Sequence, residues 1–436
     1  LRDVMTYETE DGDRAGMAFI EPRSKDDLRR RAAAFAAWAE ATCGLIGRSP
    51  DYMNACMMMV GAAAVHLGAH DPVFGERARN IYLDARRRDL CFTHTFIPAH
   101  VDRNRPPSEQ PASLRVLRET SEGPIVSGAR VVATLAPFSD ANLVILGGPL
   151  NLENDPGAES MAIAFTCPAN APGLRWSCRD VLDHERPLYD APLAGRIDEQ
   201  DALAIFEEVL VPWENVFVYR DLEIYNRQFQ HYRLNESLGH QVLIKNIAKT
   251  RFLFGLAHLI AESKQINGFI NVQERLGDFV IFLANLEALA IAAVEGAVQD
   301  PANGLWYANP RAVYAGLRLY PEYYPKMIDH LIQLGASDFV VMPPAGTLAA
   351  LGDDAEHLFA GAAEHAREKV ALFRLAWDVA GSGWGGRQEL YERFFFGDTT
   401  IMKAQGYLRE DKTAPAAMVQ RLLRGNGTPE QPFPVD

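Results

Sequence analysis

Hydrophobic residues recur with a helical period over the first part of the chain. Apolar positions mark one face of residues 28–46, which predicts a helix there. Residues 53–67 are apolar nearly all round, as is typical of a buried helix. A third helical stretch, 76–89, ends in three arginines that suit a helix C-terminus. We therefore expect an N-terminal helical domain over residues 1–90, with an irregular, polar start at 1–22.

After residue 90 the pattern changes to short apolar runs separated by Gly, Pro, Asn and Asp. Such runs predict β-strands. The strands are expected at 114–119, 125–135, 143–146, 161–166 and 203–211. The long polar loop 147–159 is expected to be functional or mobile. The sequence therefore predicts a central antiparallel β-barrel or sandwich over residues 91–236.

The helical period returns near residue 239 and persists to residue 424. Long helices with short links predict a bundle. Its helices are expected at 244–266, 278–298, 310–334, 355–379 and 390–407. The domain boundaries are placed at 237–424 for the bundle and 425–436 for a Gly/Pro-rich tail. The chain is therefore predicted to have an α+β multidomain fold, with N-terminal helices, a central β domain and a C-terminal helical bundle.

The most apolar segment of the chain is 279–298. Asn285, Glu287 and Glu295 interrupt it, which favours a buried bundle helix over a membrane span.

Charge and cysteine content narrow the classes of partner. The 436 residues carry 43 basic and 57 acidic side chains, a net charge of -14, which argues against nucleic acid or an anionic membrane as the main partner. A locally basic pocket for a phosphate-bearing cofactor remains compatible with this charge. Five scattered cysteines without a CxxC pair favour neither a disulfide framework nor a zinc site. We expect no bound metal, no signal peptide and a cytoplasmic location.

One stiff corner between two predicted helices presents chemically active side chains. Gly47 is a typical helix stop, Ser49 can cap the next helix, and Pro50 suits its first position. The corner holds Arg48 and Tyr52 at defined positions. Both donate hydrogen bonds and can grip a phenolate or an oxyanion. The alternative is an arginine packed over the helix junction and a tyrosine in the core.

Two histidines six positions apart, His94 and His100, begin the predicted β domain. A metal would need further ligands, and no Cys or carboxylate cluster is adjacent. His94 is therefore interpreted as a hydrogen-bonding or acid/base group. A structural histidine with satisfied hydrogen bonds is the alternative.

The segment 381–386, GSGWGG, matches the pattern GxGxxG. The dinucleotide-binding fingerprint requires a preceding strand, whereas residues 372–379 are predicted to be helical, so we reject that interpretation. Glycines at this density allow close backbone approach, and their exposed N–H groups can bind phosphate. A sharp turn between helices is the alternative.

Five motifs together resemble a known family. They occur in family order over nearly the whole chain: GRSPDY (47–52), FTH (92–94) with VDR (101–103), GPIVSGARVVAT (123–134), VLVPWENVFVYRD (209–221) and GSGWGGRQELYE (381–392). The chain resembles the oxygenase component of 4-hydroxyphenylacetate 3-hydroxylases, which are two-component flavin monooxygenases with an acyl-CoA dehydrogenase-like fold. The related 4-hydroxybutyryl-CoA dehydratases carry a Cys seven residues after a His. Here His240 is followed at that distance by Ile247, which disfavours that branch.

The resemblance implies roles for particular residues. Arg48, Tyr52 and His94 would bind the phenol hydroxyl beside the flavin, with His94 as general base. The implied flavin contacts are His100, Val101, Asp102, Arg103, Thr134, Ser382, Gly383, Trp384 and Gly385. The chain departs from the family at Pro98-Ala99-His100, where Asn-Pro-Pro or Asn-Pro-Gln is common. It also departs in the substrate loop, where Gly148 and Pro149 replace residues that reach the substrate's carboxylate. We therefore expect a phenol other than 4-hydroxyphenylacetate.

The implied reaction is ortho-hydroxylation of a phenol, free or carrier-bound. Reduced FAD would come from a separate reductase, and O2 would add to it to give a C4a-hydroperoxyflavin. The resemblance also implies a homotetramer in which 381–386 contacts FAD of a neighbouring subunit. The alternatives are an acyl-CoA dehydrogenase-like oxidoreductase with a catalytic carboxylate, N-oxygenation of an amine by the same hydroperoxide, and a non-catalytic assembly subunit.

Overall fold

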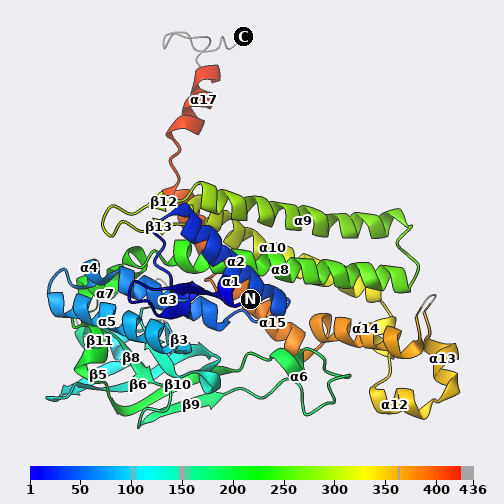
Figure 1. Cartoon of the computed structure of the whole chain (residues 1–436), viewed down its shortest axis with the longest axis horizontal. Helices are drawn as coiled ribbons and strands as arrows, with labels where there is room; N and C mark the ends of the chain where they lie inside the picture. Colours follow the sequence, from blue (N-terminus) through cyan, green and yellow to red (C-terminus); the bar gives the residue numbers. More distant parts are fainter. Residues whose placement is uncertain are drawn as a thin grey trace.

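The computed structural model describes residues 1–99, 102, 104–146, 152, 155, 157–361 and 364–423. Helices of the N-terminal part lie over two β-sheets, and long helices form a bundle beside them (Figure 1). The chain enters through elements that the sequence did not predict, a short helix and a β-hairpin within the stretch expected to be irregular. These are α1 (Arg2–Met5), β1 (Thr6–Glu8), β2 (Arg14–Gly16) and the 3-10 turn η1 (Met17–Phe19).

Three principal helices follow, close to the predicted positions. They are α2 (Lys25–Ala41), α3 (Pro50–Ala62) and α5 (Pro72–Arg88), with the single turn α4 (Ala64–Leu67) between the last two. The predicted helix 28–46 ends earlier because Cys43 and Gly44 both take positive φ angles, 53° and 66°. The apolar pattern of α3 correctly predicted burial, since every residue from Asp51 to Ala62 is buried.

Two open sheets form the central part of the chain. One has the strand order β4-β6-β10-β9, with β5 also on β6, and the other has the order β11-β8-β7-β3. A single hydrophobic cluster draws residues from both sheets, and Phe165 and Phe206 meet edge to face at 5.9 Å. The strands are β3 (Phe92–Thr95), β4 (Ile97–Pro98), β5 (Arg115–Glu119), β6 (Pro124–Thr134), β7 (Ala141–Val144), β8 (Ile163–Pro168), β9 (Leu174–Cys178), β10 (Asp201–Leu210) and β11 (Val216–Tyr219).

Of the predicted antiparallel barrel or sandwich, the barrel was wrong, and the sheets are not purely antiparallel. Within the described ranges the sheets do not close into a barrel. Strand β3 also pairs in parallel with β7, from Phe92 opposite Ala141 to Thr95 opposite Val144. The chain crosses to the other sheet through β4, β5 and β6 before it returns as β7, and a crossover of this kind is what a parallel pair needs.

The bundle is built from long helices with shorter ones at its end. The predicted segment 355–379 is two helices, α13 and α14, and 390–407 is split into α15 and α16 at Gly397, whose φ is 99°. The helices are α7 (Leu222–His231), α8 (Leu234–Ser263), α9 (Ile270–Glu295), α10 (Pro310–Gly335), α11 (Asp338–Val341), α12 (Ala345–Ala350), α13 (Asp353–Phe359), α14 (Ala366–Ala380), α15 (Gly383–Phe394), α16 (Thr399–Arg409) and α17 (Thr413–Leu423). Three smaller elements complete the set: α6 (Ala194–Ile197), β12 (Val298–Gln299) and β13 (Trp306–Tyr307).

Helix α9 lies at the surface of the bundle, not inside it as predicted (Figure 1). Among the described helices it alone is long and apolar enough to cross a membrane, by length and composition, but only 28% of its most apolar window is buried. One side packs on α8 and α10, whereas Ile270, Ile281 and Ile291 are exposed. The apolar pattern runs round the helix, but this chain supplies neighbours on one side only.

Candidate active site

The carboxylate of Asp51 stabilises the corner between α2 and α3 through hydrogen bonds. Ser49 occupies the N-cap position, but its hydroxyl donates to Asp51 and caps no backbone N–H, so the predicted cap was wrong. Asp51 also accepts the backbone N–H of Tyr52 at 3.0 Å. Burial raises the pKa of the Asp51 carboxyl to about 6.

Gly47 is required at this corner by a close contact with α15. A Cβ atom placed on Gly47 would lie 2.2 Å from the ring carbon Cζ and the hydroxyl of Tyr391. Only glycine leaves room for that ring. The sequence motif that contains Tyr391 therefore packs directly against the motif that contains Arg48, although Tyr391 itself was not predicted as a site residue.

The Arg48 side chain is buried among aromatic rings. Its guanidinium carbon lies 4.4 Å from the ring centroid of Tyr52, 5.1 Å from that of Phe395 and 5.8 Å from that of Tyr391. Its Nε and Nη1 atoms are buried and have no hydrogen-bond partner within the described residues. No carboxylate of the described residues forms an ion pair with the Arg48 guanidinium. A buried cation with unused donors is costly unless a ligand completes its hydrogen bonds.

His94 reaches the same place from strand β3, all of whose residues are buried. Its ring centroid is 6.3 Å from that of Tyr52, and the ring stacks on Phe96 at 4.0 Å. Both ring nitrogens are buried without a partner in the described structure. Burial, and then the charge of Arg48, lower the pKa of His94 well below 6.5, so the imidazole is neutral.

Tyr52 completes the set from the first turn of α3. Burial raises the pKa of its phenol, and the positive charge of Arg48 opposes that rise. The structure thus brings the predicted trio of Arg48, Tyr52 and His94 together from a corner, a helix and a strand. Arg48 and His94 keep buried nitrogens without a partner in the described residues, and groups of these kinds can bind an oxygen atom.

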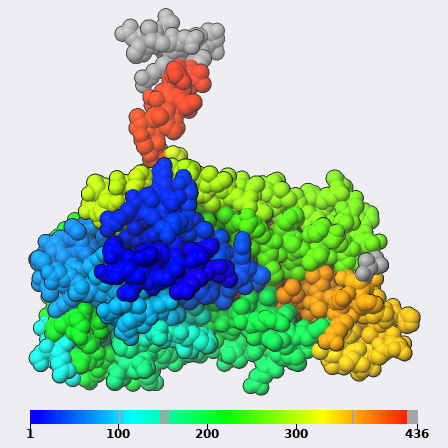
Figure 2. Space-filling view, in the orientation of Figure 1, coloured from blue at the N-terminus to red at the C-terminus, as the bar shows by residue number. Residues whose placement is uncertain are grey.

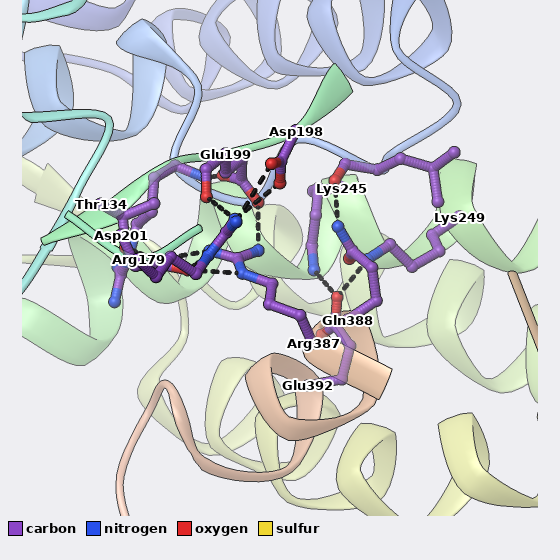
Figure 3. A network of polar contacts seen from close by, with 12 residues as sticks. Thr134, Arg179, Asp198, Glu199, Asp201, Lys245, Lys249, Arg387, Gln388 and Glu392 are labelled. Atoms are coloured by element: carbon purple, nitrogen blue, oxygen red, sulfur yellow. Dashed lines mark hydrogen bonds and ion pairs between the residues drawn. The ribbon is translucent and has the colours of Figure 1, made fainter. Parts of the chain in front are cut away.

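A charged network fixes the corner from the other side (Figure 3). Glu199 accepts the backbone N–H of Arg48 at 2.6 Å and pairs with Arg387 of α15 at 2.7 Å. Arg387 also pairs with Asp201 at 2.7 Å, and Asp201 accepts the hydroxyl of Thr134 at 2.9 Å. Thr134, a predicted flavin contact, is therefore joined to the Arg48 corner through two ion pairs.

Sequence reasoning did not find Glu199, Asp201 or Arg387. The one available signal was that Arg387 immediately follows the glycine-rich motif. Its pairs lie 186 and 188 positions away, beyond any local pattern.

The predicted flavin contacts at 382–385 form the junction of α14 and α15. Ser382 caps α15 by accepting the N–H of Gly385 at 3.1 Å, and it donates to the carbonyl of Asp378 at 2.7 Å. A Cβ on Gly385 would lie 2.1 Å from the carbonyl oxygen of Val379. Gly383 opens the helix, and Trp384 is fully buried with no described partner for its Nε1. The dinucleotide-binding fingerprint was rejected because it needs a strand before the glycines. The structure confirms that helix α14 precedes them. The interhelical turn is therefore present, and contact with flavin stays a prediction.

Of the predicted flavin contacts at 100–103, the structure describes Asp102. Its backbone N–H donates to Gln110 at 3.0 Å, and its carboxylate accepts the N–H of Asn104 at 2.9 Å. His100, Val101, Arg103, Gly148 and Pro149 lie outside the described residues.

The chain thus brings an arginine, a tyrosine and a neutral histidine together in a buried position where its helices meet its sheets. Residues 1–218 match the family model described as 4-hydroxyphenylacetate 3-hydroxylase N terminal, and residues 225–424 match the C-terminal model. The chain belongs to the 4-hydroxyphenylacetate 3-hydroxylase family.

Individual relatives agree with this assignment. The oxygenase component of 4-hydroxyphenylacetate 3-monooxygenase from Thermus thermophilus is 40% identical over 405 residues, which cover 92% of this chain and 82% of the relative. A Streptomyces globisporus monooxygenase is 32% identical over 413 residues, covering 91% and 75%. It is named for a (3S)-3-amino-3-(3-chloro-4-hydroxyphenyl)propanoyl group on a peptidyl-carrier protein.

Among solved structures, an oxygenase component of 4-hydroxyphenylacetate 3-monooxygenase complexed with FAD and 4-hydroxyphenylacetate superposes with a TM-score of 0.91. It is 39% identical, and the match covers 97% of this chain and 87% of that one.

Proposed function

We propose that the protein is the oxygenase component of a two-component monooxygenase that hydroxylates a phenol ortho to its hydroxyl group. It uses O2 and reduced FAD supplied by a separate reductase. The observation that carries the proposal is the convergence of Arg48, Tyr52 and His94, with unused buried polar atoms, on one position. Relatives named as oxygenase components, and their complex with FAD and a phenol, support it.

The chain's residues fit a flavin beside this position. The indole Nε1 of Trp384, a predicted flavin contact, is buried and unpartnered within the described structure. Thr134 and the turn 382–385 are the segments that would hold FAD, the turn by way of a neighbouring subunit. Reduced FAD, when bound, supplies the electrons that activate O2 for transfer of one oxygen atom to an aromatic carbon.

The protein's own contribution is to bind, orient and ionise the phenol. Arg48 and Tyr52 donate hydrogen bonds to the phenol oxygen and favour its phenolate form, because the guanidinium places fixed positive charge where negative charge develops. Neutral His94 has one nitrogen that can accept the phenol proton, so it is the candidate general base. Phenolate character raises the electron density of the ortho carbon, and that carbon then takes the oxygen atom.

Burial of the trio excludes water from the reacting position. Arg48 is packed among Tyr52, Tyr391 and Phe395, and His94 is covered by Phe96. A dry site strengthens the hydrogen bonds to the phenol oxygen and protects the activated oxygen species from unproductive release as peroxide.

The substrate is proposed as a phenol, free or tethered to a carrier protein. The Streptomyces relative, named for a carrier-bound phenol, supports the tethered form. An acyl-CoA dehydrogenase-like reaction would need a free catalytic carboxylate. Of the described carboxylates at the Arg48 corner, Glu199 is occupied by the Arg48 backbone and Arg387, and Asp51 by Ser49 and the N–H of Tyr52. The order of helices, sheets and bundle supports the predicted acyl-CoA dehydrogenase-like fold.

We also propose a homotetramer that works in the cytoplasm. Exposed apolar side chains on α9 support association, and so does α17, which stands away from the body and exposes Met418, Val419, Leu422 and Leu423 (Figure 2). All five cysteines are free thiols, in keeping with a reducing compartment.

A panel assay tests the proposed reaction. The full chain is supplied with a flavin reductase, NADH, FAD and O2, and a series of para-substituted phenols is screened for the corresponding catechols by mass spectrometry. A catechol formed only when the chain is present supports the proposal. Formation of peroxide alone with every phenol, or an N-oxygenated product from an amine series, would overturn it.

A further inference from the structure

Two buried lysines share a single carboxylate next to the charged network of Arg387 (Figure 3). Lys245 and Lys249 of α8 contact Glu392 Oε1 of α15 at 2.6 and 2.5 Å, and the three side chains are at most 1% exposed. Lys249 also donates to Gln388 at 2.9 Å. With two ammonium groups and one carboxylate, the cluster carries a surplus positive charge. Burying such a charge is unfavourable unless an anion offsets it.

A stacked aromatic pair contacts both this cluster and Arg48. The rings of Tyr391 and Phe395 lie 4.3 Å apart and are 8° from parallel. Lys245 Nζ is 5.4 and 5.5 Å from their centroids, and the Arg48 guanidinium is 5.8 and 5.1 Å from the same two centroids. Both cations therefore lie against the same pair of rings, in buried surroundings that screen charge poorly compared with water.

The neighbouring charged network is not neutral. Arg387 faces two carboxylates, Glu199 and Asp201, and Asp201 is shared with Arg179. The charge of Glu199 also acts on Lys245 and opposes the fall of its pKa. On α10, the hydroxyls of Tyr320 and Tyr324 stay neutral, because burial and then the charge of Glu392 raise their pKa values well above 10. At the surface end of α15, Glu389 is paired with Arg393.

Glu392 carries one negative charge in all, and both lysines contact the same oxygen of its carboxylate. The other oxygen adds no further negative charge. It has no hydrogen-bond partner in the described residues and lies at a small cavity of about 10 Å³, enough for one water molecule. Asn246, Tyr320 and Arg318 line the same cavity, and each has an unpartnered buried polar atom. Arg318 forms no ion pair with a described carboxylate, so it adds to the positive potential.

We infer that Lys245 is a positioning residue for the reaction: through the Tyr391–Phe395 pair, its charge holds a phenol bound at Arg48 in the phenolate form. The inference rests on the proposed function. The substrate oxygen is the anion that the proposed reaction places beside Arg48, and Lys245 adds a second positive charge against the same two rings.

The charge of Lys245 is available at neutral pH and is lost on the alkaline side. Burial lowers its pKa to about 8, and the neighbouring Glu392 opposes that fall. Its contribution to phenolate binding is therefore full below pH 8 and disappears above it.

A phenol whose ionised form absorbs visible light tests the inference without turnover. Difference spectra of the full chain with bound 4-nitrophenol, with and without FAD, give the pH at which the bound probe ionises. Lys245→Met should raise this value by roughly one pH unit, because one positive charge close to the bound anion is removed. Lys245→Arg, which keeps the charge, should restore it.

A matched control lies on the same helix. Lys264 pairs with Asp338 at 3.0 Å at the far end of α8, so Lys264→Met should leave the probe's ionisation unchanged. Should Lys245→Met not fold, Lys249→Met removes the same surplus charge and should give a similar rise. A bound probe that ionises at the same pH in wild type and in the lysine variants would overturn the inference alone. A probe that does not bind, or binds equally well to Arg48→Ala, would overturn the proposed function as well.

Discussion

The backbone N–H of Arg48 donates a hydrogen bond to Glu199 across 2.6 Å, although 151 positions separate the two residues. This bond ties the loop before α3 to the end of the central sheets. Because Glu199 is itself buried and paired with Arg387, the position of the Arg48 backbone depends on a side chain from the C-terminal bundle. Three distant parts of the chain therefore set the place of one guanidinium.

Arg387→Met should destabilise the protein strongly. The change leaves Glu199, with a side chain 1% exposed, without its cationic partner, and loss of one member of a buried pair costs about 3–5 kcal/mol. Chemical denaturation measures the free energy of unfolding. Arg175→Met is the matched control, because Arg175 and Glu207 form an exposed pair, which contributes little to stability. Equal effects of the two substitutions would contradict the importance of the Glu199 pair.

Arg48→Ala should abolish hydroxylation while leaving FAD binding nearly intact. Removal of the principal positive charge facing the phenol oxygen should lower the rate at least about 100-fold, as loss of one preorganised donor does elsewhere. Product yield and FAD affinity are measured side by side. Arg118→Ala is the control, since Arg118 pairs at the surface with Glu208. An unchanged product yield in Arg48→Ala would remove Arg48 from the mechanism.

His94 should remain neutral across the physiological range. Its pKa is held well below 6.5 by burial and by Arg48, whereas the pKa of exposed His70 is raised by its hydrogen bond to Asp221. Nitrogen-15 NMR of the imidazoles at pH 6 should show His70 mostly protonated and His94 neutral. Protonation of both rings in step would refute this assignment.

The same pKa shift has a consequence for stability. Below pH 6.5 His94 is protonated in the unfolded chain but not in the folded chain. The free energy of unfolding therefore decreases as the pH is lowered through that range. His94→Gln should reduce this slope, by at most about 1.4 kcal/mol per pH unit. Unfolding experiments at pH 7 and pH 5.5 measure the difference between the two slopes. Parallel slopes for wild type and variant would argue against a neutral, buried His94.

Two adjacent glycines of the turn between α14 and α15 should respond oppositely to alanine. Gly385→Ala places a methyl group against the carbonyl of Val379 and should lower the melting temperature. Gly386 has nothing within 4 Å of the corresponding position, so Gly386→Ala should be neutral or stabilising by up to about 1 kcal/mol through helix propensity. Thermal unfolding of both variants measures this, and a similar loss in each would contradict the packing described.

Local patterns predicted the part of the site that is built locally. The proline start places Tyr52 in the first turn of α3 and Arg48 just before it, as expected, whereas the helix stop predicted at Gly47 was wrong, because α2 already ends at Ala41. The extended run that carries His94 is a buried strand. The meeting of Arg48, Tyr52 and His94 was predicted from the family resemblance. No pattern within one segment of the sequence indicates it.

The rest of the fold depends on contacts that no local pattern records. Strand β9 was missed because Leu174–Cys178 is short and mostly exposed at the end of its sheet. The early end of α2 follows from the approach of Gly44 to the backbone of α8, where a Cβ would lie 2.5 Å from the nitrogen of Lys249. The pairs of Arg387 and the shared carboxylate of Lys245 and Lys249 join residues far apart in the chain.

A single-turnover experiment tests the central claim most directly. The full chain is mixed without oxygen with one equivalent of reduced FAD and a phenol that has given a catechol in the panel assay, and is then exposed to O2. Catechol and peroxide are quantified after one turnover. The account predicts close to one catechol per reduced FAD in wild type and peroxide in its place in Arg48→Ala. Equal catechol yields from both proteins, or peroxide without catechol from wild type, would contradict it.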